Sequence, residues 1–250
     1  KYWRQTRNLT EIYIMNTAYT GPPWPELKTH NIAGLRFYEV PNGEKYPSIT
    51  SVLGKRPDKQ KGLQEWRQRV GEVEANKIAR RGANRGTAFH NIVEDFLTMD
   101  YEAFEEKLEN DHKSRNLLAW AMFSQAKHII NESVGNIYLM EQSMFSDRYK
   151  VAGRCDLISM FDGVPTVVDW KTSTMIKKDE WNEDYYTQCA AYASMYSDHT
   201  GELIDDLAIV MVAEDGEIEV FKKKVSDYLP RLDTIMEEFY DNLEERLAAA

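Results

Sequence analysis

The chain has 250 residues, of which 42% are hydrophobic and 12% aromatic, a composition typical of a globular protein and not of a disordered one. This length is enough for one large domain with a substantial core, or for a domain with an arm. The net charge of −10 argues against a protein that coats duplex DNA in general, because phosphate binding requires cations.

The N-terminal half is predicted to contain an arm followed by helices. Residues 1–45 look irregular and form the predicted arm, with one candidate strand over 35–40. The residues after it predict a loop that enters a short helix near residue 50, with Ser48 or Thr50 as its N-cap. A helix is predicted over 60–82, broken by Gly82 and Gly86. Further helices are predicted over 87–98, 101–109 and 114–132.

The second half of the chain changes to a strand pattern. Strands are predicted over 137–145, 150–161, 166–171, 206–212 and 217–223, and helices over 183–197 and 226–247. Asp162 and Gly163 separate the second and third strands and supply the positive φ angles that a hairpin turn needs. This order predicts an α/β (α+β layered) fold, in which helices flank a central mixed β-sheet within a domain over 46–250.

The sequence lacks the signals of a membrane protein or of an oxidising compartment. It has no run of about eighteen apolar residues, and its first residues lead into a polar stretch, so we expect no membrane span and no signal peptide. The two cysteines, Cys155 and Cys189, are too few for a disulfide framework or a four-thiolate cluster. We therefore expect an intracellular protein, from the cytoplasm of a bacterial or phage-infected cell or from a mitochondrion.

Positive charge is concentrated in residues 51–90, which carry ten Lys or Arg and four Asp or Glu and therefore sum to +6. The rest of the chain then sums to −16, because the total is −10. A polyanion responds to the charge within a Debye length of about 8–10 Å, so this segment could bind nucleic acid. A solvated helix face explains the same charges equally well.

The strongest chemical signal is a pair of aspartates on one predicted hairpin. Asp156 lies on the outgoing strand and Asp169 on the return strand, and Lys171 shares a face with Asp169 because the two are two residues apart. Two neighbouring carboxylates repel each other unless a cation binds between them, and carboxylate oxygens favour Mg²⁺ or Mn²⁺. Lys171 could then stabilise charge on a phosphate. The alternative is a surface hairpin with a cross-strand Asp–Lys pair.

Two weaker signals lie on predicted helices. His90 and Glu94 are four residues apart and share a helix face, as a metal-ligand or acid–base pair would, although a surface hydrogen bond is the commoner reason. Arg85 and Thr87 stand where the second helix is predicted to begin, and a helix N-terminus binds anions such as phosphate.

A second pair at helical spacing occurs late in the chain. Gln188 and Tyr192 are also four residues apart, and both side chains can bind a sugar-phosphate strand. Such residues are ordinary on an amphipathic helix.

These motifs occur in an order that resembles a known group of nucleases. The matching residues are Arg85-Gly86-Thr87 with His90, Gly153 with Asp156, Val168-Asp169-Trp170-Lys171-Thr172-Ser173, Gln188 with Tyr192, and Tyr46-Pro47-Ser48-Ile49-Thr50. Together they resemble the RecB-like branch of the PD-(D/E)xK nuclease superfamily, and within it the mitochondrial genome maintenance exonucleases and their phage and bacterial relatives. The resemblance covers about residues 46–223 and implies a restriction-endonuclease-like core.

The resemblance also implies residue roles. It implies metal ligation by His90, Asp156, Asp169 and the Trp170 carbonyl, with Mg²⁺ or Mn²⁺ as the ion. It implies catalytic roles for Asp156, Asp169 and Lys171, to which we add Glu94 and Glu141. For DNA binding we select Ser48, Arg81, Arg85, Thr87, Thr172, Gln188 and Tyr192. The cysteines that hold an iron–sulphur cluster in some relatives are missing, so we expect no such cluster.

We therefore expect a metal-dependent DNA exonuclease that acts on single-stranded ends in repair, recombination or replication. A structure-specific endonuclease and a non-catalytic nucleic-acid-binding module of the same fold remain alternatives. Trp66, Tyr46 or Phe89 could stack on bases, although aromatic side chains are more often buried.

Overall fold

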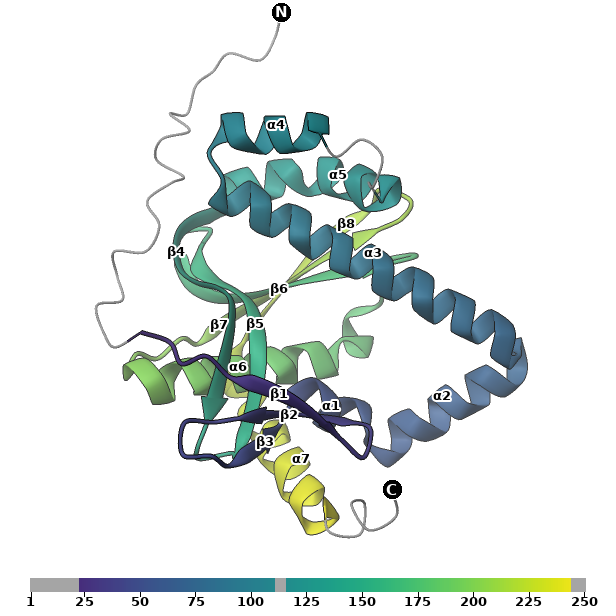
Figure 1. Ribbon diagram of the computed structural model, residues 1–250, viewed down its shortest axis with the longest axis vertical. Coiled ribbons are helices and arrows are strands. Elements are labelled where there is room, and N and C mark those ends of the chain that lie inside the picture. The colour runs from purple at the N-terminus through teal and green to yellow at the C-terminus, as the bar shows by residue number, and fades with distance from the viewer. Residues whose placement is uncertain (1–22, 111–115, 244–250) are drawn as a thin grey trace, which may run out of the picture.

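The computed structural model describes residues 23–110 and 116–243, and its centre is a five-stranded sheet with the order β4-β5-β6-β7-β8 (Figure 1). The strands are β4 (Val134–Ser146), β5 (Val151–Phe161), β6 (Val164–Ser173), β7 (Asp206–Ala213) and β8 (Ile218–Lys224). Neighbouring strands are antiparallel, except that β6 and β7 are parallel. The predicted mixed sheet is therefore confirmed.

Helices cover both faces of this sheet, as Figure 1 shows. One face is covered by α3 (Glu72–Thr98) and α5 (Leu117–Ser133), with α4 (Tyr101–Asn110) packed on the outside of these two helices. The other face is covered by α1 (Ile49–Gly54), α6 (Glu183–Thr200) and α7 (Leu229–Asp241). Short 3-10 helices, η2 (Asp179–Trp181) and η3 (Val225–Asp227), precede α6 and α7. The predicted layered α/β fold is confirmed. Within residues 23–110 and 116–243, no helix is both long and apolar enough to cross a membrane.

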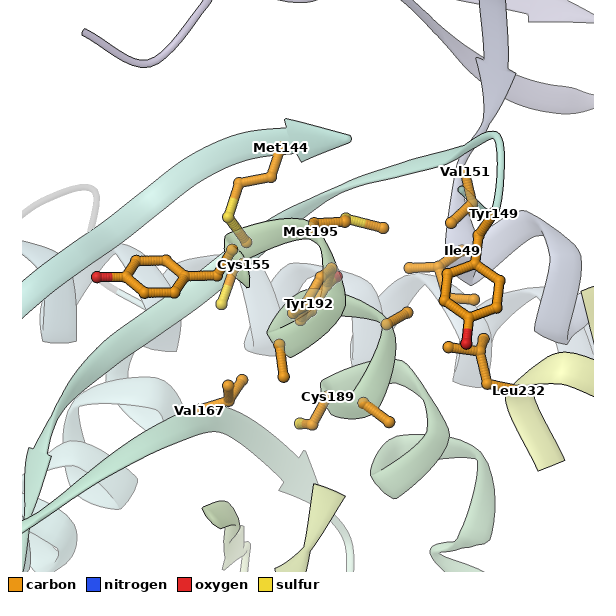
Figure 2. Close-up of a cluster of buried hydrophobic side chains, with 14 of the residues drawn as sticks. Ile49, Met144, Tyr149, Val151, Cys155, Val167, Cys189, Tyr192, Met195 and Leu232 are labelled. Atoms are coloured by element: carbon orange, nitrogen blue, oxygen red, sulfur yellow. The ribbon is translucent and has the colours of Figure 1, made fainter. Parts of the chain in front are cut away.

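The apolar core lies in two layers, one on each side of the sheet. The layer between the sheet and α6 includes Met144, Cys155, Cys189 and Tyr192, which Figure 2 shows packed together. The other layer includes Phe89 and lies beneath α3 and α5. Strand β6 contributes Val167 to the first layer and Val168 to the second, which is the alternation expected of a strand buried on both faces.

A small antiparallel sheet precedes the first helix. It contains β1 (Lys28–Ile32), β2 (Leu35–Glu39) and β3 (Lys45–Pro47), of which only β2 was predicted. Leu35 and Phe37 of β2 are buried in the α6-side layer of the core. Residues 28–39 are thus more ordered than the irregular pattern predicted, while the arm boundary at residue 45 stays a prediction. Residues 1–22 of the arm lie outside the described residues.

The prediction that Gly82 and Gly86 break the basic helix is wrong. The break is at Gly71, whose φ of 85° separates α2 (Pro57–Val70) from α3, and both later glycines lie inside α3. A single glycine costs a helix only about 1 kcal/mol, and burial of the following apolar face, which includes Phe89 and Val93, outweighs that cost. Consequently there is no helix N-terminus near Thr87 within the described chain.

Two local predictions are confirmed. Ser48 is the N-cap of α1, and its hydroxyl accepts a hydrogen bond from the Ser51 backbone N–H. Asp162 and Gly163 have φ angles of 49° and 79° and join β5 to β6 in a tight turn.

Candidate active site

The candidate site lies in a fork between β5 and β6. These strands pair from Phe161 and Val164 as far as Leu157 and Val168, where the ladder stops. The next residues are Asp156 and Asp169, so the two predicted aspartates stand where the strands separate.

Beyond the end of the β5–β6 ladder, the side chain of Asp156 makes the contact with β6 that backbone hydrogen bonds make elsewhere. Its Oδ2 accepts a hydrogen bond of 2.9 Å from the Trp170 backbone N–H. Cys155 packs in the α6-side layer and Leu157 in the opposite layer, although residues two apart share a face in a regular strand. Strand β5 therefore changes face at Asp156, and this irregularity directs the carboxylate into the fork.

Glu141 lies on β4, on the other side of β5 from β6, and has an unusual backbone conformation. Its φ is 46°, which is uncommon for a residue other than glycine. Met140 pairs with Leu157 and Gln142 with Cys155, so Glu141 lies opposite Asp156. Arg154 donates a hydrogen bond of 2.7 Å to Glu141 Oε2, which leaves the other oxygen directed toward His90.

His90, on α3, connects these carboxylates to the return strand. Its Nε2–H donates to the Trp170 carbonyl at 2.9 Å, while Nδ1 lies 3.5 Å from Asp156 Oδ2 and 3.6 Å from Glu141 Oε1. The predicted ligand His90 is thus brought to the aspartate and to the predicted carbonyl ligand, although 80 residues of sequence separate it from Trp170.

The donor set in the fork fits a divalent cation. Ligand atoms of His90, Glu141 and Asp156 all lie within 4.8 Å of one another. Two carboxylates and one imidazole suit Mg²⁺ and Mn²⁺, and an ion between them would remove the repulsion of the two acids. Asp169 lies beside this group and faces the α6 side of the sheet.

Asp169 is held from two directions. Lys171 forms an ion pair with its Oδ2, and the Gln188 amide donates a hydrogen bond of 3.2 Å to its Oδ1. The same amide donates to the Tyr192 hydroxyl at 2.9 Å. Asp169 is only 1% exposed, so these contacts replace the water that its charge has lost.

Charges in the fork shift one another's pKa values. Burial and the Asp169 carboxylate raise the pKa of Asp156 to about 7, against the opposing effect of His90. Burial by itself would lower the pKa of His90, but Asp156 and Glu141 outweigh it and raise that pKa to about 9. Burial also opposes the charge of Lys171, yet Asp169 keeps the pKa of Lys171 above its usual value. A proton on His90 Nδ1 and a cation beside Asp156 and Glu141 would therefore compete for the same position.

Comparison with known proteins identifies the family of the chain. The profile of the PD-(D/E)XK nuclease superfamily matches residues 63–249, which is most of the chain and includes every element of the fork. The chain belongs to the PD-(D/E)XK nuclease superfamily. Nucleases of this superfamily cleave nucleic acids with divalent metal ions, which agrees with the donor set of His90, Glu141 and Asp156.

Two individual proteins are similar to this nuclease. Human mitochondrial genome maintenance exonuclease 1 is 28% identical over an alignment of 133 residues, and the match covers 51% of this chain and 36% of the human protein. The crystal structure of a candidate exonuclease from Eubacterium rectale has a TM-score of 0.46 and 14% identity, and the match covers 67% of this chain and 68% of that one.

Several residues predicted to bind DNA have protein partners in the nuclease. Arg85 is buried, forms an ion pair with Glu214 and donates a hydrogen bond of 3.1 Å to the Thr172 carbonyl. Arg81 binds the other oxygen of Glu214 at 2.6 Å. The anion site predicted at a helix N-terminus beside Arg85 and Thr87 is wrong, because α3 is continuous there and Thr87 is an exposed residue within it.

The remaining predicted residues differ in exposure. Ser48 and Tyr192 are 1% exposed, so in this structure Ser48 caps α1 and Tyr192 supports Gln188. Their predicted roles in DNA binding stay predictions. Glu94 is half-buried, and burial together with the Glu141 charge raises its pKa.

Two of the three aromatic candidates for base stacking are buried. Phe89 is fully buried. Tyr46 is 4% exposed, and its hydroxyl donates a hydrogen bond to Asp147. The structure therefore contradicts the prediction that either ring stacks on a nucleic-acid base. Apolar packing in the core explains both. Trp66 on α2 remains half-exposed.

Glu214 and Arg154 lie at the site but were not predicted from the sequence. Glu214 lies in the β7–β8 turn, where an acidic residue carries no signal of its own, yet it holds both Arg81 and Arg85. Arg154 lies within the Gly153-to-Asp156 motif and could have been suspected from that position alone.

Proposed function

We propose that this nuclease is a deoxyribonuclease that removes nucleotides from single-stranded DNA ends with Mg²⁺ or Mn²⁺, in repair, recombination or replication. The observation that carries the proposal is the convergence of His90, Glu141 and Asp156 in the β5–β6 fork, directly beside the Asp169–Lys171 pair. The carboxylate oxygens can bind a divalent cation, and the positive charge of Lys171 can bind a phosphodiester.

Each residue of the fork has a distinct proposed role. His90, Asp156 and Asp169, with the Trp170 carbonyl, would hold the ion, and Glu141 would add a further carboxylate. The ion would supply Lewis-acid stabilisation of the phosphate and lower the pKa of a bound water. Lys171 would stabilise negative charge that develops on the phosphate oxygens, because its pKa keeps it protonated.

Gln188 and Tyr192 are proposed to position Asp169. The Gln188 amide donates to both Asp169 and Tyr192, and both side chains are buried. An outer residue that fixes a ligand's carboxylate controls the geometry of the ion without touching it.

The preference for single-stranded ends is supported by two observations. The human relative that shares 28% identity with the matched half of the chain is named as an exonuclease. The excess of positive charge over residues 51–90 lies on α1, α2 and the first part of α3. Within the described chain, no side chain of α2 is buried. A net-negative protein with a local basic segment can bind a single strand there and repel duplex elsewhere.

The test uses four DNA substrates of one sequence with Mg²⁺ or Mn²⁺: linear single strands blocked at the 5′ or 3′ end, circular single strands, and duplex. We expect cleavage of at least one blocked linear strand and survival of the circle. Cleavage of the circle would favour an endonuclease, and binding without cleavage of any substrate would favour a non-catalytic module.

Variants link this activity to the fork. Asp156→Asn, Asp169→Ala and Lys171→Ala should each lower kcat by about 10²–10³-fold. Lys222→Met is a matched control, because Lys222 pairs with Asp162 at the opposite end of β6. Activity that persists in Asp169→Ala or Lys171→Ala would contradict the assignment of the site.

A further inference from the structure

The loop after β6 returns to the catalytic lysine. In the parallel pairing of β6 and β7, Lys171 lies next to Met211. The Lys177 backbone N–H, six residues later, contacts Sδ of the same Met211 at 3.4 Å. This contact places the start of the β6–α6 loop against the strand that neighbours Lys171, so residues 171 and 177 approach each other although the chain turns between them.

Tyr185 of α6 lies between the two lysines. The Lys171 ammonium lies 4.9 Å from the centre of the Tyr185 ring, and the Lys177 ammonium lies 4.8 Å from the same centre. Lys177 also donates a hydrogen bond of 2.7 Å to the Tyr185 hydroxyl. One aromatic side chain therefore contacts both ammonium groups.

The two lysines differ in how their charge is compensated. Lys171 forms an ion pair with Asp169. In contrast, among residues 23–110 and 116–243 no carboxylate lies within ion-pair distance of the Lys177 ammonium, which is half-buried and bonded to a neutral hydroxyl. Gathering two like charges around one ring and leaving one of them without an anion is unfavourable in the free protein. A phosphodiester bound beside Lys171 would supply the missing negative charge.

We propose that Lys177 and Tyr185 form a phosphate subsite next to the catalytic centre, at which Lys177 binds a phosphodiester of the same nucleic-acid strand. Lys177 contacts the strand, and Tyr185 is a positioning residue that holds the Lys177 ammonium by its hydroxyl and the Lys171 ammonium by its ring face. This inference rests on the proposed function, since its ligand is the nucleic-acid backbone.

The experiment measures binding of a fluorescein-labelled 20-nucleotide oligo(dT) at several salt concentrations. All proteins carry Asp156→Asn to prevent cleavage, a change that retains an oxygen acceptor for the Trp170 N–H. The test variants are Lys177→Met, Lys177→Arg and Tyr185→Phe, and Lys222→Met is the control because its ammonium is paired with Asp162 at the far end of β6.

The subsite predicts a specific change in salt dependence. Each phosphate contact with single-stranded DNA contributes about 0.7 to the slope of log K against log salt concentration, so Lys177→Met should lower that slope by about 0.7. Affinity at low salt should fall several-fold, and Lys177→Arg should restore both values. Tyr185→Phe keeps the charge, so affinity should fall while the slope is retained. Lys222→Met should match the parent.

Other outcomes are equally informative. If the parent binds the oligonucleotide and Lys177→Met has an unchanged slope, the phosphate subsite is refuted while the proposed function stands. If the parent itself does not bind and the wild-type protein does not cleave, the proposed function fails. A lower unfolding temperature with an unchanged slope in Lys177→Met and Tyr185→Phe would show that this pair is structural only.

Discussion

The side-chain amide of Gln188, on α6, donates a hydrogen bond of 3.2 Å to Oδ1 of Asp169, on β6. Because Lys171 occupies Oδ2 of the same carboxylate, Gln188 determines how the remaining oxygen is oriented. Gln188 is itself held by Tyr192, whose ring packs against the backbone at Gly153. This chain of contacts connects the packing of α6 on the sheet to the geometry of the active site.

Replacing Gln188 with alanine should lower kcat about 10–100-fold, because the Asp169 carboxylate loses the contact that orients it. The KM for a DNA strand should change little. Steady-state kinetics and Mn²⁺ titration of the same variant measure both effects. Gln188→Glu should be more damaging, since it places another acid beside Asp169, in a site that already contains Asp156 and Glu141. An increase in KM with unchanged kcat would instead identify Gln188 as a DNA contact.

Metal affinity should rise with pH. His90 has a pKa of about 9 in the metal-free fold, and a ligand imidazole must be neutral, so binding between pH 7 and 9 should release about one proton per ion. Below pH 7 the Asp156 carboxyl, with a pKa of about 7, should release a second proton. The slope of log K against pH is therefore expected to be about +1 between pH 7 and 9 and to steepen toward +2 below pH 7.

Calorimetric titration of Mn²⁺ in buffers with different ionisation enthalpies would count these protons. His90→Ala serves as the comparison, because it removes the group that titrates near pH 9. A pH-independent affinity in the wild-type protein between pH 7 and 9 would refute this account of His90.

Gly153→Ala should destabilise the fold by about 1–3 kcal/mol, which is the usual cost of overpacking a core. A Cβ at this position would lie 2.7 Å from Tyr192 Cε1 and 3.1 Å from Ile49 Cγ2. Because Tyr192 supports Gln188, activity should fall as well. Denaturant unfolding measures the loss. The control is Gly62→Ala on α2, where nothing lies within 4 Å of the new Cβ and a gain of up to about 1 kcal/mol is expected.

Glu214→Ala should cost about 3 kcal/mol of unfolding free energy, because it leaves the buried guanidinium of Arg85 without its carboxylate. Arg85 also holds the Thr172 carbonyl, so the strand end after Lys171 should loosen and kcat should fall. Arg81→Met removes the other, exposed arginine that pairs with Glu214. The Arg81 side chain is 63% exposed, so its loss should change stability by no more than about 0.5 kcal/mol. Similar losses in both variants would contradict this distinction.

Periodicity and turn chemistry predicted most of the fold. The β-branched run Thr166-Val167-Val168 favours a strand, and Asp162-Gly163 favours a turn with positive φ, because both signals depend on neighbouring residues alone. The helix break was placed incorrectly, since a glycine's effect depends on the tertiary packing around it. Gly71 has no apolar face to hold it in a helix, whereas Gly82 and Gly86 precede one.

By itself, the sequence determined the family, the layered fold and the identity of Asp156, Asp169, Lys171 and His90 as candidates, because these follow from residue type, order and spacing. Only the tertiary structure decided what each of them touches. The β5–β6 fork, the positive φ of Glu141 and the return of Lys177 to Lys171 depend on contacts between distant segments. Such contacts arise from packing and from the pairing of buried charges, which no local pattern encodes.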